Sequence, residues 1–299
     1  MTPSVKQLKY LIALDDFRHF GKAATACCIS QSAFSIAIKE LETTLNVQLI
    51  DRSNKSVTIT EAGRAIVAQA RICLNDIEAL MNIAVNEQEV LSGQLTLGVI
   101  PTIAPYLLPR FIAETIKRFP NLKLFLREDK TALLHEQLLE GKLDLLLVAL
   151  PFQMRNVMVM PLFTDPFLLA CRKGSRWLTT SKNRMDLGSL PDESILLLED
   201  GHCLRDHALT ACHLRDSEKI SRFAATSLQT LLQMVVADIG VTFLPAMAQQ
   251  SLMGESSDLE LHPLSKQNCR EIGLVWRKGS SRGDEFSMLG EMLQELHQQ

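Results

Sequence analysis

Apolar residues recur at helical spacing through the first sixty residues of the chain. Residues 5–14 show this spacing first and predict an amphipathic helix. A run rich in alanine over residues 20–27 predicts a second helix, and residues 31–45, preceded by Ser30 as N-cap, predict a third. Two short β-prone runs between residues 49 and 60 then predict a hairpin. Two helices joined by a short turn and followed by a hairpin indicate a winged helix-turn-helix.

Short polar side chains begin the third predicted helix and suit the reading of base edges. A lysine one turn further along can reach a phosphate, and two basic residues in the hairpin can reach the backbone or the minor groove. The predicted DNA contacts are Gln31, Ser32, Ser35, Lys39, Arg52 and Lys55. The alternative is a small helical domain whose polar residues are only solvated. Because residues 1–66 are only weakly basic, the spacing supports DNA binding more strongly than the charge does.

A long apolar stripe follows the hairpin, over residues 60–89. A helix of that length exceeds an ordinary domain element and is better interpreted as a linker that pairs with a second copy. From residue 91 onward, predicted strands and helices alternate, which indicates an α/β region with largely parallel sheets. The predicted strands cover residues 94–100, 122–128, 143–150, 157–162, 167–171, 195–198, 221–225, 241–244 and 271–276.

These patterns divide the chain into three parts. Residues 1–60 form the predicted DNA-binding domain, residues 61–90 the linker and dimerisation helix, and residues 91–299 an effector region. The effector region is expected to contain two Rossmann-like subdomains. The first covers about 91–163 and 268–299, and the second about 164–267.

The segment around Cys203 carries the most specific chemistry. A strand-like apolar run, residues 195–198, ends at a turn in which Asp200 can serve as an N-cap. Cys203 then lies in the first turn of a short helix, where the helix dipole, His202 and Arg205 all favour the thiolate. A thiolate is the species that attacks peroxides and forms a sulfenic acid.

A second cysteine, Cys212, follows nine residues later. On a helix, nine residues rise about 13 Å and place the two thiols on opposite faces. Because a disulfide needs Cα atoms within about 7 Å, a Cys203–Cys212 bridge requires the segment to rearrange. The alternative is a pair of unrelated cysteines in a reduced protein.

Composition narrows the possible classes of protein. The chain has 299 residues, a net charge of −3 and seven cysteines, so its total charge gives no indication of nucleic-acid or membrane binding. It shows neither a signal peptide nor a run of the roughly 18 apolar residues that a membrane span needs. A cytoplasmic location with reduced thiols is expected. The cysteines lack paired ligand spacing and the histidines are scattered, so no metal and no cofactor is expected.

Strand-to-helix loops of α/β sheets commonly hold ligands. Thr102, Thr131 and Ser227 each place a hydroxyl at the start of a predicted helix, where a small polar or anionic ligand could bind. The alternative for each loop is a plain helix cap. Arg270, before the last predicted strand, is equally ambiguous.

Taken together, these motifs resemble the LysR-type transcriptional regulators. Residues 5–64 resemble their winged helix-turn-helix, and the remainder resembles their effector region of the periplasmic-binding-protein type. More narrowly, the chain is similar to the peroxide-sensing members of that family. The stretches that carry this likeness are residues 18–20, 100–109, 198–206, 225–228 and 272–275.

The resemblance implies a role for each candidate residue. Cys203 would be the peroxidatic cysteine and Cys212 the resolving one. The implied peroxide site comprises Thr102, Thr131, His202, Asp206 and Arg270. The family resemblance further implies a bacterial DNA-binding regulator, not an enzyme, that forms a tetramer from two dimers, contacts RNA polymerase and takes hydrogen peroxide as its signal. Gln31 is followed by Ser-Ala-Phe instead of the usual Pro-Thr-Leu, so the operator is left open.

Three other functions remain open at this point. The chain could be a LysR-type regulator that binds a small carboxylate between its effector subdomains, with Cys203 incidental. It could be a thiol peroxidase, which the helix-turn-helix argues against. It could also be a binding protein without DNA affinity.

Overall fold

The structure is a computed structural model that describes residues 2–53, 56–85, 91–178, 187, 190–214, 218–253, 258–265 and 267–298. Its α-helices are α1 (Val5–Phe17), α2 (Phe20–Ala26), α3 (Gln31–Leu45), α4 (Glu61–Val85), α5 (Ala104–Arg118), α6 (Thr131–Leu139), α7 (Cys203–Ala211), α8 (Leu228–Val236), α9 (Gln249–Met253) and α10 (Gly283–Gln298). Its strands are β1 (Ile50–Ser53), β2 (Ser56–Ile59), β3 (Gly93–Val99), β4 (Leu122–Glu128), β5 (Leu145–Leu150), β6 (Val157–Arg172), β7 (Ile195–Leu198), β8 (Ile220–Ala225), β9 (Thr242–Pro245), β10 (Leu259–Pro263) and β11 (Cys269–Arg277).

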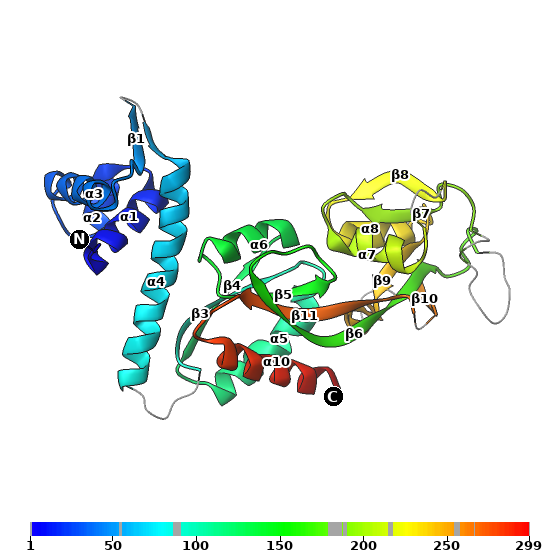
Figure 1. Cartoon of the computed structure of the whole chain (residues 1–299). Coiled ribbons are helices and arrows are strands. Elements are labelled where there is room, and N and C mark those ends of the chain that lie inside the picture. The colour runs from blue at the N-terminus through cyan, green and yellow to red at the C-terminus, as the bar shows by residue number, and fades with distance from the viewer. Residues whose placement is uncertain are drawn as a thin grey trace.

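The N-terminal part is the expected winged helix-turn-helix (Figure 1). Helix α3 begins where the sequence predicts, because the Ser30 side chain accepts a hydrogen bond from the Ala33 backbone N–H at 3.2 Å. Its apolar stripe is fully buried against α1 and α2. Strands β1 and β2 pair antiparallel and form the wing. The apolar residues that recur at helical spacing in the sequence are therefore buried together in one small core.

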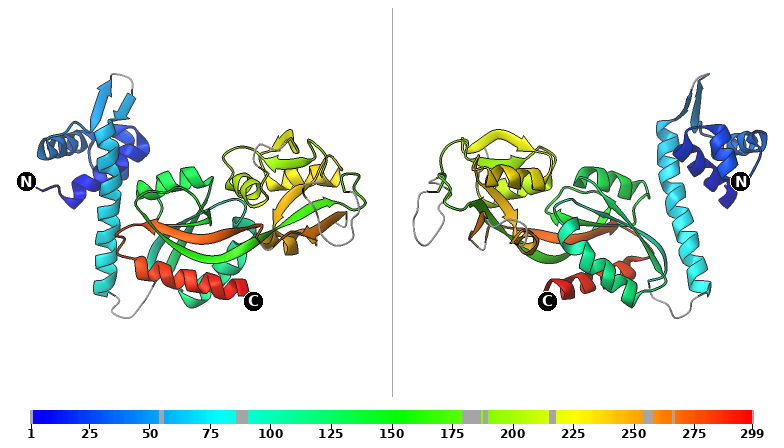
Figure 2. Two further views of the ribbon diagram at one scale, coloured as in Figure 1. Left: turned by 45° about the vertical axis from the view of Figure 1, so that its right-hand side comes forward. Right: turned by 180° about the vertical axis from the view of Figure 1, so that it is seen from behind.

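Helix α4 runs from the wing to the base of the effector region (Figures 1 and 2). Thr60 caps its start by accepting a hydrogen bond from the Gly63 backbone N–H. Along its length, Arg71 forms ion pairs with Asp15 and Asp16 of α1. Asn75 donates a hydrogen bond to Asp144 of the effector region at 3.2 Å. The helix is thus tied to both neighbours by polar contacts.

The effector region is built on a mixed sheet. The strand order is β10-β6-β11-β5-β3-β4, and β9 also pairs with β6. Only β3 with β4, β3 with β5 and β7 with β8 pair parallel among the described strands. The expectation of largely parallel sheets is therefore wrong for this sheet, because β6 and β11 run antiparallel to their neighbours.

Strand β6 replaces two strands that the sequence predicts separately, over residues 157–162 and 167–171. Pro161 and Pro166 interrupt the apolar pattern, yet the strand continues through both. A register shift opposite Ile272 and Gly273 accommodates the irregularity. Strand β10 has no counterpart among the predicted strands.

Two apolar cores result, one in each lobe of the effector region. The first lies between the β3-β4-β5-β11 sheet and helices α5, α6 and α10, and the second surrounds β7, β9, α7 and α8. Strands β6 and β11 connect the lobes (Figure 2). In the described part of the chain, no helix has the length and apolar character needed to cross a membrane.

Gly63 offers a test of the junction between the wing and α4. A Cβ atom at this position would collide with the Leu49 carbonyl and with Ile59. We expect Gly63→Ala to lower the free energy of unfolding by about 1–3 kcal/mol, since backbone atoms cannot yield as a side chain can. Chemical denaturation measures this. Gly283→Ala, also at a helical position but with its nearest atom at 3.5 Å, is the control and should not destabilise the protein; equal behaviour of the two variants would contradict the described packing.

Candidate functional site

A buried ion pair lies where the two lobes meet. Arg270 of β11 and Asp165 of β6 face each other across antiparallel strands, so their side chains project to the same face. The Arg270 guanidinium donates to Asp165 from Nε and from Nη2, both at 3.0 Å. Both side chains are almost completely buried, at 0% and 1% exposure. Two residues further along β6 pairing with β9 begins, and three residues further along pairing with β10 begins, so the ion pair marks the junction of the lobes.

Arg270 also holds the turn after β3. Its Nη1 donates to the Thr102 hydroxyl at 2.8 Å and its Nη2 to the Thr102 carbonyl at 2.9 Å. The second carboxylate oxygen of Asp165 accepts from the Met247 backbone N–H at 3.1 Å. The Arg270 Nη2 also contacts the Met247 sulfur at 3.5 Å, so the guanidinium is fixed by partners from three separate segments.

Cys203 is the first residue of α7, as the sequence predicts, and its side chain is buried. The cap differs from the prediction. His202, not Asp200, occupies the N-cap position, and it makes no side-chain capping hydrogen bond. Gly201 adopts a left-handed conformation and turns the chain, so that Asp200 pairs with Arg205 at 2.9 Å instead.

Burial dominates the electrostatics of Cys203. It raises the pKa of the thiol, and the charge of Asp206 adds to this, whereas the nearby Thr131 hydroxyl, the charge of Arg270 and the Leu204 N–H oppose it. Burial therefore outweighs the local charges that the sequence leads us to expect will favour the thiolate. Arg205, which the sequence suggested as a stabilising charge, is engaged by the Leu198 carbonyl and by Asp200.

The Thr131 hydroxyl lies where it can stabilise an ionised Cys203 thiol. It is the first residue of α6 and is 2% exposed. Its hydroxyl has no hydrogen-bond partner of normal geometry among the described residues, but a bond from it to the Cys203 sulfur would favour the thiolate. A buried hydroxyl without a partner is costly, and ionised Cys203 or a bound polar molecule would satisfy it.

A cavity of about 250 Å³ opens beside Cys203. It is lined by residues of α7, the turn after β5 and the start of β11, among them Cys203, Asp206, His207 and Cys269. His207 lies one helical turn from Cys203. Its Nε2 is 3.1 Å from the Pro151 carbonyl and must donate to it, which leaves Nδ1 as an acceptor. That Nδ1 is buried and has no hydrogen-bond partner within the described residues.

The structure brings together some, but not all, of the five predicted peroxide-site residues. Thr102 and Arg270 are in direct contact, and Thr131 and Arg270 both act on Cys203. Asp206 is exposed and borders the cavity. The side chain of His202 makes no hydrogen bond to the other four in the described region, and burial together with the charge of Lys130 lowers its pKa. Its imidazole is therefore neutral near pH 7.

Cys212 lies at the opposite end of α7, as its C-cap. Cys203 packs in the core of the first lobe and Cys212 in the core of the second. Both are free thiols. Burial raises the pKa of Cys212 to about 11, with only a hydrogen bond from Asn268 acting the other way. An intact α7 separates the two residues by roughly 13 Å, so a bridge between them requires α7 to unwind.

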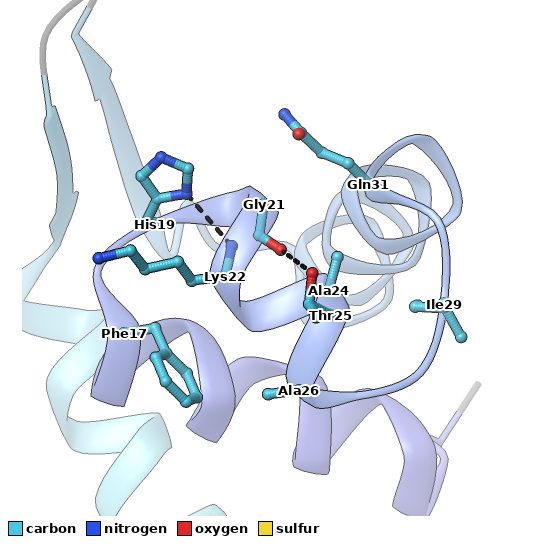
Figure 3. Close-up of a pocket in the computed structure, with 9 residues that line it drawn as sticks. All are labelled: Phe17, His19, Gly21, Lys22, Ala24, Thr25, Ala26, Ile29 and Gln31. Carbon is cyan, nitrogen blue, oxygen red and sulfur yellow. Dashed lines mark hydrogen bonds between the residues drawn. The ribbon is translucent and has the colours of Figure 1, made fainter.

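The predicted DNA-contacting residues occupy α3 and the wing. Gln31, Ser32 and Lys39 are exposed and Ser35 is half-buried. Arg52 falls in β1, whereas Lys55 lies outside the described residues. A hollow of about 680 Å³ lies between the end of α1, α2 and the start of α3, and its lining includes Lys22 and Gln31. Figure 3 shows these lining residues and two hydrogen bonds among them, from the Lys22 backbone N–H to His19 and from the Thr25 hydroxyl to the Gly21 carbonyl.

The third loop considered as a ligand site is a plain cap. Ser227 accepts a hydrogen bond from the Thr230 backbone N–H at 3.2 Å. The remaining two loops, at Thr102 and Thr131, both reach the surroundings of Arg270 and Cys203.

Comparison with protein families places these features in a known context. Residues 5–64 match the model of the bacterial regulatory helix-turn-helix proteins of the lysR family. Residues 88–298 match the LysR substrate binding domain. The chain belongs to the LysR family. It is therefore a DNA-binding transcription regulator.

Among LysR-family relatives, the DNA-binding transcriptional dual regulator OxyR of Escherichia coli K12 is 38% identical over 97% of this chain and 94% of its own length. The HTH-type transcriptional regulator EstR of Acinetobacter baylyi is 36% identical over 98% of this chain and 97% of its own. A solved full-length OxyR variant from Pseudomonas aeruginosa covers 98% of this chain and 95% of itself, at 32% identity and a TM-score of 0.81. A hydrogen-peroxide-bound OxyR variant from Corynebacterium glutamicum covers 100% and 94%, at 33% identity and a TM-score of 0.66.

Sequence reasoning missed Asp165 and His207. Asp165 stands between two apolar runs, and the only signal was a lone carboxylate in an otherwise β-prone stretch. His207 shows a weak signal, since it lies four residues after Cys203 and must share a helix face with it. Neither could be assigned a partner without the tertiary structure.

Asp165→Asn tests whether the junction depends on the ion pair. The substitution leaves the buried Arg270 charge uncompensated, which typically costs about 3–5 kcal/mol of stability. We expect a lower midpoint of urea unfolding. The control is Glu295→Gln, which removes an exposed partner of Arg118 and should leave the midpoint unchanged. An unchanged midpoint for Asp165→Asn would contradict the assigned role.

Proposed function

We propose that this LysR-family chain is a transcription regulator that senses hydrogen peroxide through Cys203. The observation that carries the proposal is the placement of Cys203 at the start of α7, beside Thr131, the cavity and the Arg270 guanidinium. Relatives named as hydrogen peroxide-inducible genes activators support it, including one from Dickeya chrysanthemi that is 37% identical over 98% of this chain.

The first step is the oxidation of Cys203. The thiol loses its proton, the sulfur attacks one peroxide oxygen, and the O–O bond breaks. The leaving hydroxide takes up a proton, so that thiol and peroxide become sulfenic acid and water. Hydroxyls of Thr102 and Thr131 can hold the peroxide oxygens, and the Arg270 charge favours both the thiolate and the developing hydroxide. We place Asp206 and His202 at the edge of this peroxide site.

His207 is the proposed proton acceptor. Burial lowers its pKa, and the charge of Arg270 lowers it further, so the imidazole is neutral near pH 7 and its Nδ1 can take a proton. Cys203, with a raised pKa, is protonated at the same pH. A neutral base one helical turn away can therefore receive the thiol proton, and it can return that proton to the leaving hydroxide.

The second step joins Cys203 to Cys212. The Cys212 sulfur displaces water from the sulfenic acid, and a disulfide forms. Because each end of α7 packs in a different core, formation of the disulfide unwinds α7 and shifts the two lobes relative to each other. The new lobe arrangement would alter how a tetramer, formed from two dimers, presents its helix-turn-helix units to DNA and to RNA polymerase.

The binding of a small carboxylate is the weaker alternative. The Arg270 charge is already neutralised by Asp165 at 3.0 Å, so a carboxylate in this region would lack a free counter-charge. We further propose that the chain regulates genes and is not an enzyme, that it works in the bacterial cytoplasm, and that it divides at about residues 60 and 90. The predicted contacts Gln31, Ser32, Ser35, Lys39, Arg52 and Lys55 would bind the operator.

Cys203→Ser tests the proposal. In the wild type, hydrogen peroxide should produce a Cys203–Cys212 disulfide, seen by mass spectrometry, and change the DNase footprint upstream of the chain's own gene. Without the Cys203 sulfur the proposed peroxidatic thiol is absent and Cys212 has no sulfenic acid to attack, so the footprint of Cys203→Ser should not respond to peroxide.

Two matched variants complete this experiment. Cys73→Ser, in α4, should respond as the wild type does. Lys39→Ala should weaken DNA binding and its salt dependence while Cys203 still oxidises. A footprint of Cys203→Ser that still changes with peroxide would refute peroxide sensing at this residue.

His207→Gln tests the proton acceptor. Glutamine keeps a donor for the Pro151 carbonyl but cannot accept the thiol proton, so oxidation of Cys203 at pH 7 should slow by about 10²-fold. The wild-type rate should fall only as pH drops through the lowered pKa of His207. The variant rate should instead rise steadily with pH, because hydroxide must deprotonate a thiol of raised pKa. Stopped-flow oxidation across pH measures both, with His213→Gln as the control; parallel pH profiles would remove His207 from the mechanism.

A further inference from the structure

Strand pairing in the second lobe brings together three side chains of metal-ligand type. Cys171 of β6 lies directly opposite Glu260 of β10 in an antiparallel pair, so both project to the same face. His262 follows Glu260 by two residues, and side chains two apart on a strand share a face. A thiol, a carboxylate and an imidazole therefore meet although β6 and β10 are distant in the sequence.

The ligand atoms of these three residues are close enough to share one ion. They all lie within 4.8 Å of one another. Around a tetrahedral zinc ion, bonds of about 2.0–2.3 Å separate neighbouring ligand atoms by roughly 3.3–3.8 Å. The His262 Nε2 is 3.5 Å from a Glu260 carboxylate oxygen. Only small side-chain rotations are needed to bring the thiol into the same coordination sphere.

The cluster is not saturated by protein hydrogen bonds. The His262 Nε2 atom is buried and forms no hydrogen bond of normal geometry with the described residues. Within the described residues, the Cys171 thiol makes a weak contact with the Glu260 backbone carbonyl at 3.6 Å. The Glu260 carboxylate, half exposed at 48%, leaves a path from solvent. The buried His262 Nε2 atom is therefore an acceptor that an entering ion could bind.

The local field favours a cation. The Glu260 carboxylate oxygen lies 3.5 Å from the His262 Nε2 atom, and its negative charge would attract a positive ion. A coordinating thiol is deprotonated outright by the metal ion. Binding would therefore leave the ion on the Cys171 thiolate and release the thiol proton to solvent.

We propose that Cys171, Glu260 and His262 form a binding site for a divalent cation of the zinc class, with water completing the coordination. Thiolate and imidazole select Zn²⁺ and its neighbours over Mg²⁺ and Ca²⁺, which prefer oxygen ligands. The ion would clamp the edge strand β10 to β6. The expectation from sequence spacing that the chain holds no metal site is thus reconsidered, because the ligands come from paired strands and not from one motif.

Cobalt binding to the full chain tests the site directly. The protein is kept reduced with a phosphine and titrated with Co²⁺, whose tetrahedral thiolate complexes show a charge-transfer band and intense visible bands. We expect one Co²⁺ per chain, displaced by an equivalent of Zn²⁺. Zn²⁺ should also raise the thermal unfolding midpoint, because it binds only the folded chain.

Four variants identify the ligands. Cys171→Ser should lose the charge-transfer band, and His262→Gln, at a half-buried edge position where folding is not at risk, should weaken Co²⁺ binding at least tenfold. Cys28→Ser removes an exposed thiol next to Cys27 and Cys203→Ser removes the sensing thiol; both should keep the band. Retention of full affinity in His262→Gln, or loss of the band in Cys28→Ser or Cys203→Ser, would overturn the proposal. None of these outcomes depends on the peroxide response.

Discussion

The Arg270–Asp165 pair is the interaction on which the effector region depends. A buried guanidinium is tolerated only when its charge and its donors are all satisfied, and here Asp165, the Thr102 hydroxyl and the Thr102 carbonyl do this. The pair sits where β6 leaves β11 and begins to pair with β9 and β10. It therefore fixes the turn after β3, the crossing strands and the positive field at Cys203 in one arrangement.

Helix α7 connects that arrangement to both lobes. Its first residue, Cys203, packs with the first lobe, and its C-cap, Cys212, packs with the second. Helix geometry keeps the thiols apart as long as α7 is intact. Burial also raises the pKa of both thiols, so both are protonated near pH 7. Chemistry at one end of α7 and packing at the other are thus linked through the helix itself.

Local patterns predicted the local elements well. The bounds of α3, β4 and β7 agree with those expected, and Ser30 and Ser227 cap helices where the sequence placed caps. Each of these features is decided within a few residues. Prediction failed where pairing between strands far apart in the sequence sets the structure. Examples are the continuity of β6 through Pro161 and Pro166 and the antiparallel pairing of β11. Prediction also failed in placing the cap of α7 at Asp200, because the turn at Gly201 draws that carboxylate to Arg205.

The sequence by itself determined most of the order of the elements, the winged helix-turn-helix, and the presence of a cysteine at the start of a short helix. Those properties follow from periodicity, capping and spacing, which act over one or two turns. Only the tertiary structure decided which groups surround that cysteine: Asp165 behind Arg270, His207 beside the cavity, and burial strong enough to outweigh the nearby charges. It likewise brought Cys171 to Glu260 and His262. Solvent exclusion and strand register arise from contacts between segments far apart in the chain, and no local pattern encodes them.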